Sequence, residues 1–247
     1  MTGGQGRLLV LIHGWGFSRA VWDPVAERLR DRPLWIPDLP GHGEASGGGE
    51  LEDVRAVGQA LTERLPPGTR EPIWVGWSMG GLVALAAAAR WPGRQRLALV
   101  CSTPRFTAER DWPGALKPED IGAFGQELFR DRAALERRFA ALCARGDPFP
   151  GALRRELLNA MAEHPARLEG LRAGLLALAK TDLRAEWAGL DAPVAAWLAG
   201  DDALVPSVAP ALQALRPDVQ LERVPGGHAS WLREPAAMAA FLRGVAA

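Results

Sequence analysis

Cysteine is scarce in this sequence, and its scarcity argues against two classes of protein. Only Cys101 and Cys143 occur among the 247 residues, far apart in the chain. A disulfide-stabilised secreted domain needs several closely spaced pairs, and a cysteine-based metal site needs a short-range motif. The two thiols could pair with each other, but we expect them to be free and buried in a reducing cytoplasm. No metal or other cofactor is predicted.

Long hydrophobic runs and an excess of one charge are also missing. The apolar stretch nearest in character to a membrane span, residues 82–91, is well short of the roughly 20 residues that cross a bilayer, and it is predicted to be a buried helix. The first residues contain neither a basic leader nor a small-residue cleavage site. Basic and acidic residues number 29 each, so the formal net charge is zero. We therefore expect a cytoplasmic monomer with no nucleic-acid or membrane partner.

Apolar runs alternate with helical patterns along most of the chain. The predicted strands are residues 7–14, 33–43, 71–78, 96–103, 192–202 and 219–228. The predicted helices between them are residues 18–30, 51–65, 79–91, 205–215 and 235–245. This alternation predicts a single α/β domain with a mostly parallel sheet and helices on both faces. Functional sites in such folds gather at the carboxyl ends of the strands.

Residues 104–185 break the alternation and are predicted to form a helical lid above the strand ends. The segment is rich in arginine and alanine and contains no convincing strand. Its amphipathic helical patterns are residues 127–146, 152–165 and 167–183. The core of the single domain, residues 1–247, is then predicted to comprise residues 1–103 and 186–247.

A serine between glycines lies where a predicted strand turns into a predicted helix. Residues 76–80 read Gly-Trp-Ser-Met-Gly, which fits the G-x-S-x-G pattern of a nucleophile elbow. Glycines permit the sharp turn without side chains that collide with the neighbouring strand and helix, and Ser78 sits strained at its tip. A helix N-terminus there would favour a developing negative charge. The alternative is a tight turn with an incidental serine.

A nucleophilic serine needs a base, and the base needs an acid that orients it. His228 follows the last predicted strand, where the chain order Ser, Asp, His places the base. By contrast, His164 is predicted to lie at a surface helix end, His42 is predicted to be structural, and His13 belongs to another motif.

The acid is expected at the end of the penultimate predicted strand, where Asp201 and Asp202 are adjacent. Neighbouring residues project in different directions, so only one can reach His228. The spacing D-x-x-V-P over residues 202–206 favours Asp202, while Asp201 stays the alternative.

Residues 13–16, His-Gly-Trp-Gly, follow the first predicted strand and suggest an oxyanion hole. Their glycines let the backbone approach a substrate, and the backbone N–H of Trp15 can join that of Met79 as a second donor. His13 is expected to support this loop through hydrogen bonds. A glycine-rich turn without an anion role is the alternative.

Together these motifs make the chain resemble the α/β-hydrolase superfamily, and more closely the pimeloyl-[acyl-carrier protein] methyl ester esterases of biotin synthesis. The resemblance covers nearly the whole chain. It rests on residues 13–16, 38–43, 73–84 and 202–206, on the late histidine, and on the lid stretches 112–128, 135–146 and 178–184.

The resemblance implies hydrolysis of the methyl ester of a pimeloyl group carried by an acyl-carrier protein, with release of methanol. It implies Ser78 as nucleophile, His228 as base, Asp202 as orienting acid, and the N–H groups of Trp15 and Met79 as oxyanion donors. It also implies that residues 139–143 line the acyl channel: Phe139, Ala140, Ala141, Leu142 and Cys143. The alternative function is a generic carboxylesterase for free small esters. A silent binding protein is disfavoured because the set of serine, aspartate and histidine is intact.

Two departures from the family pattern bear on these expectations. An N-terminal edge strand usual in the family is expected to be missing, because the first clear strand pattern starts only a few residues into the chain. Cys143 stands where the family more often has a polar residue, so its contact in the channel is the least secure of the set.

Arginines are concentrated in the predicted lid. Between residues 130 and 155 there are seven arginines against three carboxylates, a local net charge of +4 on a neutral chain. Carrier proteins are acidic, so such a patch would steer one into place. The candidate docking residues are Arg137, Arg138, Arg154 and Arg155, and the alternative is a solvated helix face.

Overall fold

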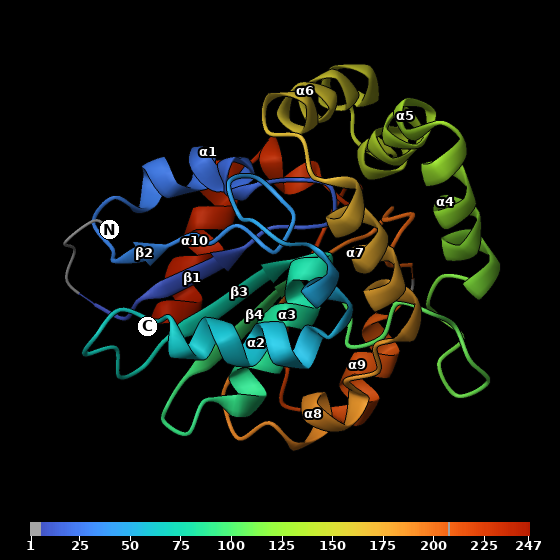
Figure 1. Cartoon of the computed structure of the whole chain (residues 1–247). Helices are drawn as coiled ribbons and strands as arrows, with labels where there is room; N and C mark the ends of the chain where they lie inside the picture. The colour runs from blue at the N-terminus through green and yellow to red at the C-terminus, as the bar shows by residue number, and fades with distance from the viewer. Residues whose placement is uncertain (1–5, 207) are drawn as a thin grey trace.

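The computed structural model of the chain describes residues 6–206 and 208–247, which contain one six-stranded parallel sheet (Figure 1). Its strand order is β2-β1-β3-β4-β5-β6, and every neighbouring pair is parallel. The strands are β1 (Leu9–Ile12), β2 (Leu34–Trp35), β3 (Ile73–Trp77), β4 (Arg96–Val100), β5 (Val194–Ala199) and β6 (Gln220–Val224). The mostly parallel sheet predicted from the sequence is confirmed.

Helices cover both faces of this sheet (Figure 1). On one face α2 packs against α3, and on the other α1 packs against α10. The helices outside the long insertion are α1 (Asp23–Ala26), α2 (Val54–Glu63), α3 (Met79–Arg90), α8 (Arg184–Gly189), α9 (Ala209–Leu215) and α10 (Pro235–Ala246). Short 3-10 helices are η1 (Arg19–Trp22), η2 (Glu27–Leu29), η3 (Gly49–Glu52) and η4 (Ser230–Leu232).

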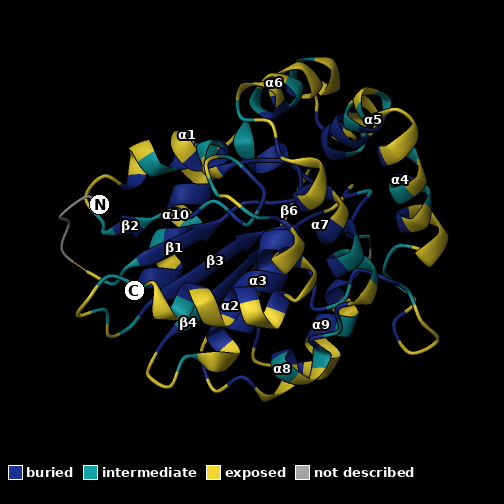
Figure 2. Cartoon of the chain, viewed as in Figure 1, coloured by how far each residue is buried: buried dark blue, intermediate teal, exposed yellow. Residues whose placement is uncertain are grey.

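The core lies between the sheet and its covering helices, as the buried ribbons of Figure 2 show. Strands β1 and β3 are buried along their whole length because both of their faces are covered. Residues 79–88 of α3 are also buried on every side, which explains why this helix consists almost entirely of small and apolar residues. A central strand and a central helix therefore hold the serine between them.

Five helices lie between β4 and β5 in the chain, and the first four of them stand beyond the carboxyl ends of the strands (Figure 1). We call these four the inserted helices: α4 (Pro118–Arg130), α5 (Arg132–Ala144), α6 (Pro150–Glu163) and α7 (Leu168–Lys180). No strand interrupts residues 104–185, where the only extended pairings are two isolated bridges, Thr107 with Leu116 and Glu109 with Trp112.

Several predicted boundaries are wrong. Residues 127–146 form two helices because Asp131 leaves the helical conformation (φ −156°, ψ 86°) and its side chain accepts a hydrogen bond from the N–H of Ala134. The strand predicted over residues 33–43 is only two residues long, since Pro37 and Pro40 lack the N–H that a strand ladder needs. The helix predicted over 18–30 is divided into η1, α1 and η2, with Pro24 in the first turn of α1.

The expectation about an N-terminal edge strand falls on residues 1–5, which lie outside the described residues. Among the residues that the structure describes, no helix has both the length and the apolar character to cross a membrane.

Candidate active site

Ser78 occupies a strained turn between β3 and α3. Its backbone has φ 55° and ψ −126°, a conformation that costs a non-glycine residue about 1–3 kcal/mol. The following residue, Met79, is the first of α3, so its N–H has no partner inside the helix and points out of the N-terminus. The serine is 5% exposed. A hydroxyl thus stands beside free backbone donors in a nearly closed site.

The glycines of the elbow are required by close backbone approach. A Cβ atom on Gly76 would lie 2.2 Å from the carbonyl oxygen of Gly80, and one on Gly80 would lie 2.4 Å from that of Ile12. The predicted collisions with the neighbouring strand and helix are therefore confirmed.

Ser102, which the sequence reasoning missed, supports the elbow from the end of β4. Its buried Oγ–H donates to the carbonyl oxygen of Ser78 at 2.6 Å, and the N–H of Gly81 donates to the same oxygen at 2.8 Å. No local pattern could have identified Ser102, because its role depends on the pairing of β4 with β3.

Asp202 and His228 meet as a buried pair. Nδ1 of His228 lies 2.9 Å from Oδ2 and 3.1 Å from Oδ1 of the carboxyl group. The N–H groups of Leu204 and Val205 donate to Oδ1 at 2.8 and 2.9 Å and fix the carboxyl plane. An Nδ1–H of the imidazole would donate to these carboxyl oxygens, and Nε2 would then be an acceptor. Nε2 is buried and has no hydrogen-bond partner among the described residues.

The structure brings Asp202, and not Asp201, to the histidine. Asp201 is exposed, and its N–H donates to the carbonyl oxygen of Gly226, so it helps to hold the loop that carries His228. The D-x-x-V-P spacing therefore selected the aspartate that contacts His228.

Residues 13–16 form a loop beside Ser78, held by two buried histidines. A Cβ on Gly14 would lie 3.2 Å from Cβ of Ser78. Nε2 of His13 accepts from the N–H of Leu39 at 2.9 Å, and Nε2 of His42 accepts from the N–H of Gly16 at 3.2 Å. Burial lowers the pKa of His13, and it lowers the pKa of His42 to about 3, with the neighbouring His13 adding to the effect. Both rings are neutral acceptors that shape the loop, as expected of His13 and His42.

His164 ends α6 as its C-cap. The side chain of Trp15 is anchored by its Nε1–H, which donates to the carbonyl oxygen of Leu171 at 2.8 Å. Within the described part of the chain, no group of three or more acidic, histidine or cysteine side chains is arranged to hold a metal ion.

The inserted helices cover the loop of residues 13–16. The ring of Phe139, on α5, makes an edge-to-face contact with Trp15 at 4.9 Å between centroids. Gly174, on α7, packs so closely that a Cβ there would lie 2.6 Å from the indole of Trp15. A Cβ on Gly16 would lie 2.8 Å from the terminal methyl of Met161, on α6. Three inserted helices therefore contact the rim of the site.

The five predicted channel residues, 139–143, divide between the interior and the surface. Phe139, Ala140 and Cys143 are buried, Leu142 is half-buried and Ala141 is exposed. The carbonyl oxygen of Cys143 accepts from the N–H of Ala229, next to the candidate base. Burial, with the charge of Asp202 as a further cause, raises the pKa of the Cys143 thiol well above its usual value, and the same holds for Cys101. Both cysteines are free, buried and close to the candidate acid.

The candidate docking arginines lie on α5 and α6. Arg137, Arg154 and Arg155 are exposed and make no ion pair among the described residues. Arg138 differs, because it pairs with Glu127 at 3.0 Å and lies over the ring of Phe124.

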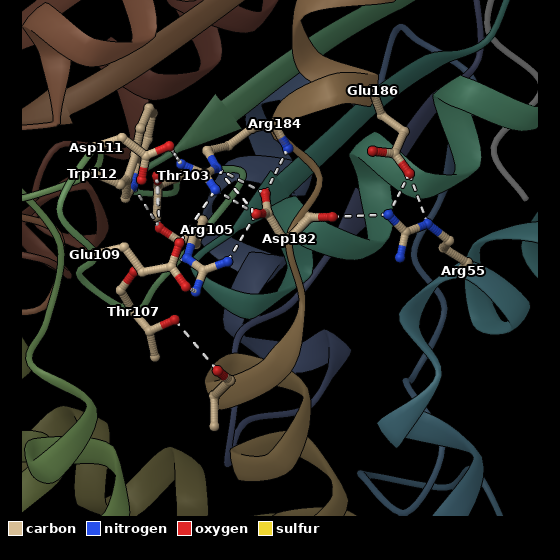
Figure 3. Close-up of polar contacts among 11 residues, drawn as sticks. Arg55, Thr103, Arg105, Thr107, Glu109, Asp111, Trp112, Asp182, Arg184 and Glu186 are labelled. Carbon is tan, nitrogen blue, oxygen red and sulfur yellow. Dashed lines mark hydrogen bonds and ion pairs between the residues drawn. The ribbon is translucent and has the colours of Figure 1, made fainter.

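An ion-pair network joins the two ends of the insertion, where the chain leaves and rejoins the core (Figure 3). Asp182 accepts from Arg105 at 2.8 Å and from Arg184 at 2.7 Å. Its carbonyl oxygen accepts from Arg55 of α2, which also bonds Glu186 at 2.6 Å. Hydrogen bonds from Arg184 and Arg105 outweigh the effect of burial and lower the pKa of Asp182 to about 2.

Solved structures share this architecture. An esterase from Exiguobacterium antarcticum matches with a TM-score of 0.87 at 20% identity, over 98% of this chain and 92% of that one. An enol-lactonase from Burkholderia xenovorans LB400 matches with a TM-score of 0.82 at 18% identity, over 99% and 93%. At these identities the likeness concerns the fold alone.

Sequence relatives are more specific. The chain matches the profile described as "Alpha/beta hydrolase family" over residues 9–241. A pimeloyl-[acyl-carrier protein] methyl ester esterase of Stenotrophomonas maltophilia is 39% identical over 97% of this chain and 93% of its own length. Another with that name, from Xanthomonas axonopodis, is 41% identical over 93% and 90%. The chain therefore belongs to the alpha/beta hydrolase family, among the pimeloyl-[acyl-carrier protein] methyl ester esterases.

Proposed function

We propose that this protein is a serine esterase that hydrolyses the methyl ester of a pimeloyl group carried by an acyl-carrier protein. The observation that carries the proposal is the buried pair of Asp202 and His228, with Nε2 of the imidazole free, in a chain whose serine occupies a strained elbow. The substrate is supported by the relatives, which bear that name at 39–41% identity over most of their length.

The reaction follows from the roles that we assign to these groups. Ser78 Oγ attacks the ester carbonyl carbon while Nε2 of His228 takes its proton, and Asp202 stabilises the resulting imidazolium. The N–H groups of Trp15 and Met79 stabilise the oxyanion, and removal of one such donor typically costs about 3–4 kcal/mol. His228 returns the proton to the departing methanol. Water, activated by the same imidazole, then hydrolyses the acyl-enzyme and frees the pimeloyl carboxylate.

We further propose that residues 104–185 act as a lid on a single domain, and that the protein works as a cytoplasmic monomer. The contacts from Phe139, Met161 and Gly174 to the loop of residues 13–16 support a lid, because they lie over a serine that is almost fully buried. Residues 139–143 would line the acyl channel beneath it.

The ratio of kcat/KM for the carrier-bound and the free methyl ester, measured by methanol release, tests the proposed substrate. We expect wild-type protein to hydrolyse methyl pimeloyl-carrier protein with a kcat/KM at least about tenfold above that for free methyl pimelate, since docking adds affinity. Ser78→Ala should reduce both rates by at least about a thousandfold. Equal kcat/KM for the two esters would favour a generic carboxylesterase, and full activity of Ser78→Ala would overturn the serine mechanism.

Charge reversal on α6 tests the docking surface. The double variant Arg154→Glu/Arg155→Glu should raise KM for the carrier-bound ester about tenfold and leave the free ester unaffected. The control, Arg70→Glu/Arg90→Glu, changes two exposed arginines near the amino ends of the strands, before β3 and at the end of α3. Equal effects of the two double variants would contradict docking on α6.

A further inference from the structure

Trp77 lies between the glycine and the serine of the elbow, and the proposed reaction leaves its side chain without a role. The indole is fully buried at the end of β3. Its Nε1–H donates to the main-chain carbonyl oxygen of His228 at 3.0 Å, across 151 residues of sequence. The residue before the candidate nucleophile is therefore bonded to the candidate base.

Other hydrogen bonds hold the loop that carries His228 on either side of this residue. The N–H of Ala229 donates to the carbonyl oxygen of Cys143 at 3.1 Å, and Oγ of Ser230 donates to that of Gly227 at 2.8 Å. Gly226 has φ +99°, so the loop enters through a conformation that glycine favours. Among the described residues, Trp77 alone donates to the carbonyl oxygen of His228 itself.

Aromatic packing holds the indole of Trp77 in place. Its ring lies 5.6 Å from the imidazole of His228, 5.4 Å from Trp231 and 4.9 Å from Phe17, measured between centroids. A ring enclosed in this way cannot easily change rotamer, because core side chains are close-packed. It can thus act as a rigid donor.

We propose that Trp77 is a positioning residue that holds the loop of His228 so that Nε2 of the imidazole faces Ser78. The inference rests on the proposed serine mechanism. Because Trp77 is covalently joined to Ser78, the end of β3 fixes the nucleophile directly and the base through one hydrogen bond. Loss of the indole N–H leaves a buried carbonyl oxygen unpaired and frees the loop to shift.

A matched pair of variants separates this role from ordinary core packing. Trp77→Phe removes the N–H and part of the ring, and Trp74→Phe does the same on the same strand. Trp74 is equally buried, and its Nε1–H donates to Oε1 of Gln95 at 3.0 Å, with no contact to the base loop. With p-nitrophenyl butyrate, Trp77→Phe should lower kcat about 10- to 100-fold with KM within about threefold, since small misplacement of a reacting group has effects of this size. Trp74→Phe should keep kcat within about threefold.

A shape-preserving replacement covers the case in which Trp77→Phe does not fold. Replacing Trp77 by 3-benzothienylalanine exchanges the N–H for sulfur in a ring of nearly the same shape, and kcat should again fall about tenfold or more. Wild-type kcat in this protein, or an equal loss in Trp74→Phe and Trp77→Phe, would overturn the proposal. Ser78→Ala distinguishes the two levels: if it is inactive while the Trp77 variants keep full kcat, only the positioning role fails, whereas an active Ser78→Ala refutes the serine mechanism.

Discussion

Two of the junctions between the insertion and the rest of the molecule have opposite chemistry. At the charged junction, where the insertion leaves and rejoins the core, Asp182 forms partly exposed ion pairs with Arg105 and Arg184 (Figure 3). At the catalytic edge, residues 143–146 meet residues 226–229 through backbone contacts, and a Cβ on Gly227 would lie 1.7 Å from the carbonyl oxygen of Arg145. The ion pairs of the charged junction can exchange partners with water. At the catalytic edge, by contrast, there is no room for a side chain at residue 227.

This difference separates what each junction can do. Ion pairs that solvent can reach are worth about 0–1 kcal/mol each, so the charged junction contributes modest stability. Such pairs also tolerate small movements of the chain. The catalytic edge sets the position of the loop that holds His228, where a shift of about 1 Å can change a rate a hundredfold. We therefore expect substitutions at the charged junction to change stability, and those at the catalytic edge to change activity.

The largest effect is expected at the acid of the catalytic edge. Asp202→Asn should lower kcat for p-nitrophenyl butyrate by about 10³- to 10⁴-fold, because the amide no longer holds the imidazole with its proton on Nδ1. The neighbouring variant Asp201→Asn is the control and should retain kcat within about threefold. If Asp201→Asn were the more damaging of the two, the assignment of the acid would be wrong.

A smaller effect is expected at Ser102, which supports the elbow without reaching the substrate. Ser102→Ala removes the Oγ–H bond to the carbonyl oxygen of Ser78 and should destabilise the fold by about 1–2 kcal/mol. Because the carbonyl oxygen keeps the bond from Gly81, kcat should fall by no more than about tenfold. Urea unfolding and steady-state kinetics measure the two quantities, and an unchanged unfolding free energy would contradict the supporting role.

The smallest effect on activity is expected at Asp182, in the charged junction. Asp182→Asn should leave kcat within about twofold and reduce the unfolding free energy by about 1 kcal/mol at pH 7, after allowance for solvent screening. The pKa of Asp182 is lowered to about 2 in the folded protein, so its contribution is present above pH 4 and is lost as the pH falls toward 2. The difference between wild type and variant should therefore shrink over this range. A difference that stayed constant down to pH 2.5 would show that the charge of Asp182 contributes no stability.

Local patterns predicted the parallel sheet, the elbow and the aspartate that contacts His228, because each has a short signature in the sequence. The G-x-S-x-G pattern located the elbow, and the D-x-x-V-P spacing separated Asp202 from Asp201. The capping aspartate Asp131 was overlooked, although an Asp that precedes a helical run is a helix start signal.

The remaining features depend on which distant segments meet, which no local pattern contains. Ser102 reaches Ser78 because β4 pairs with β3, and Trp77 reaches His228 across most of the chain. The charged junction could not be predicted from the sequence for the same reason, since Arg105 and Asp182 belong to opposite ends of the insertion. Only the folded arrangement relates these residues to the catalytic edge.

The central claim is that Ser78 is the nucleophile, and a covalent adduct tests it most directly. Wild-type protein, treated with a fluorophosphonate and digested, should yield one modified peptide with the added mass on Ser78, and loss of esterase activity should match the fraction modified. Ser78→Ala should remain unmodified under the same conditions. An adduct on another residue that accompanies loss of activity, or full activity in protein modified at Ser78, would contradict the account.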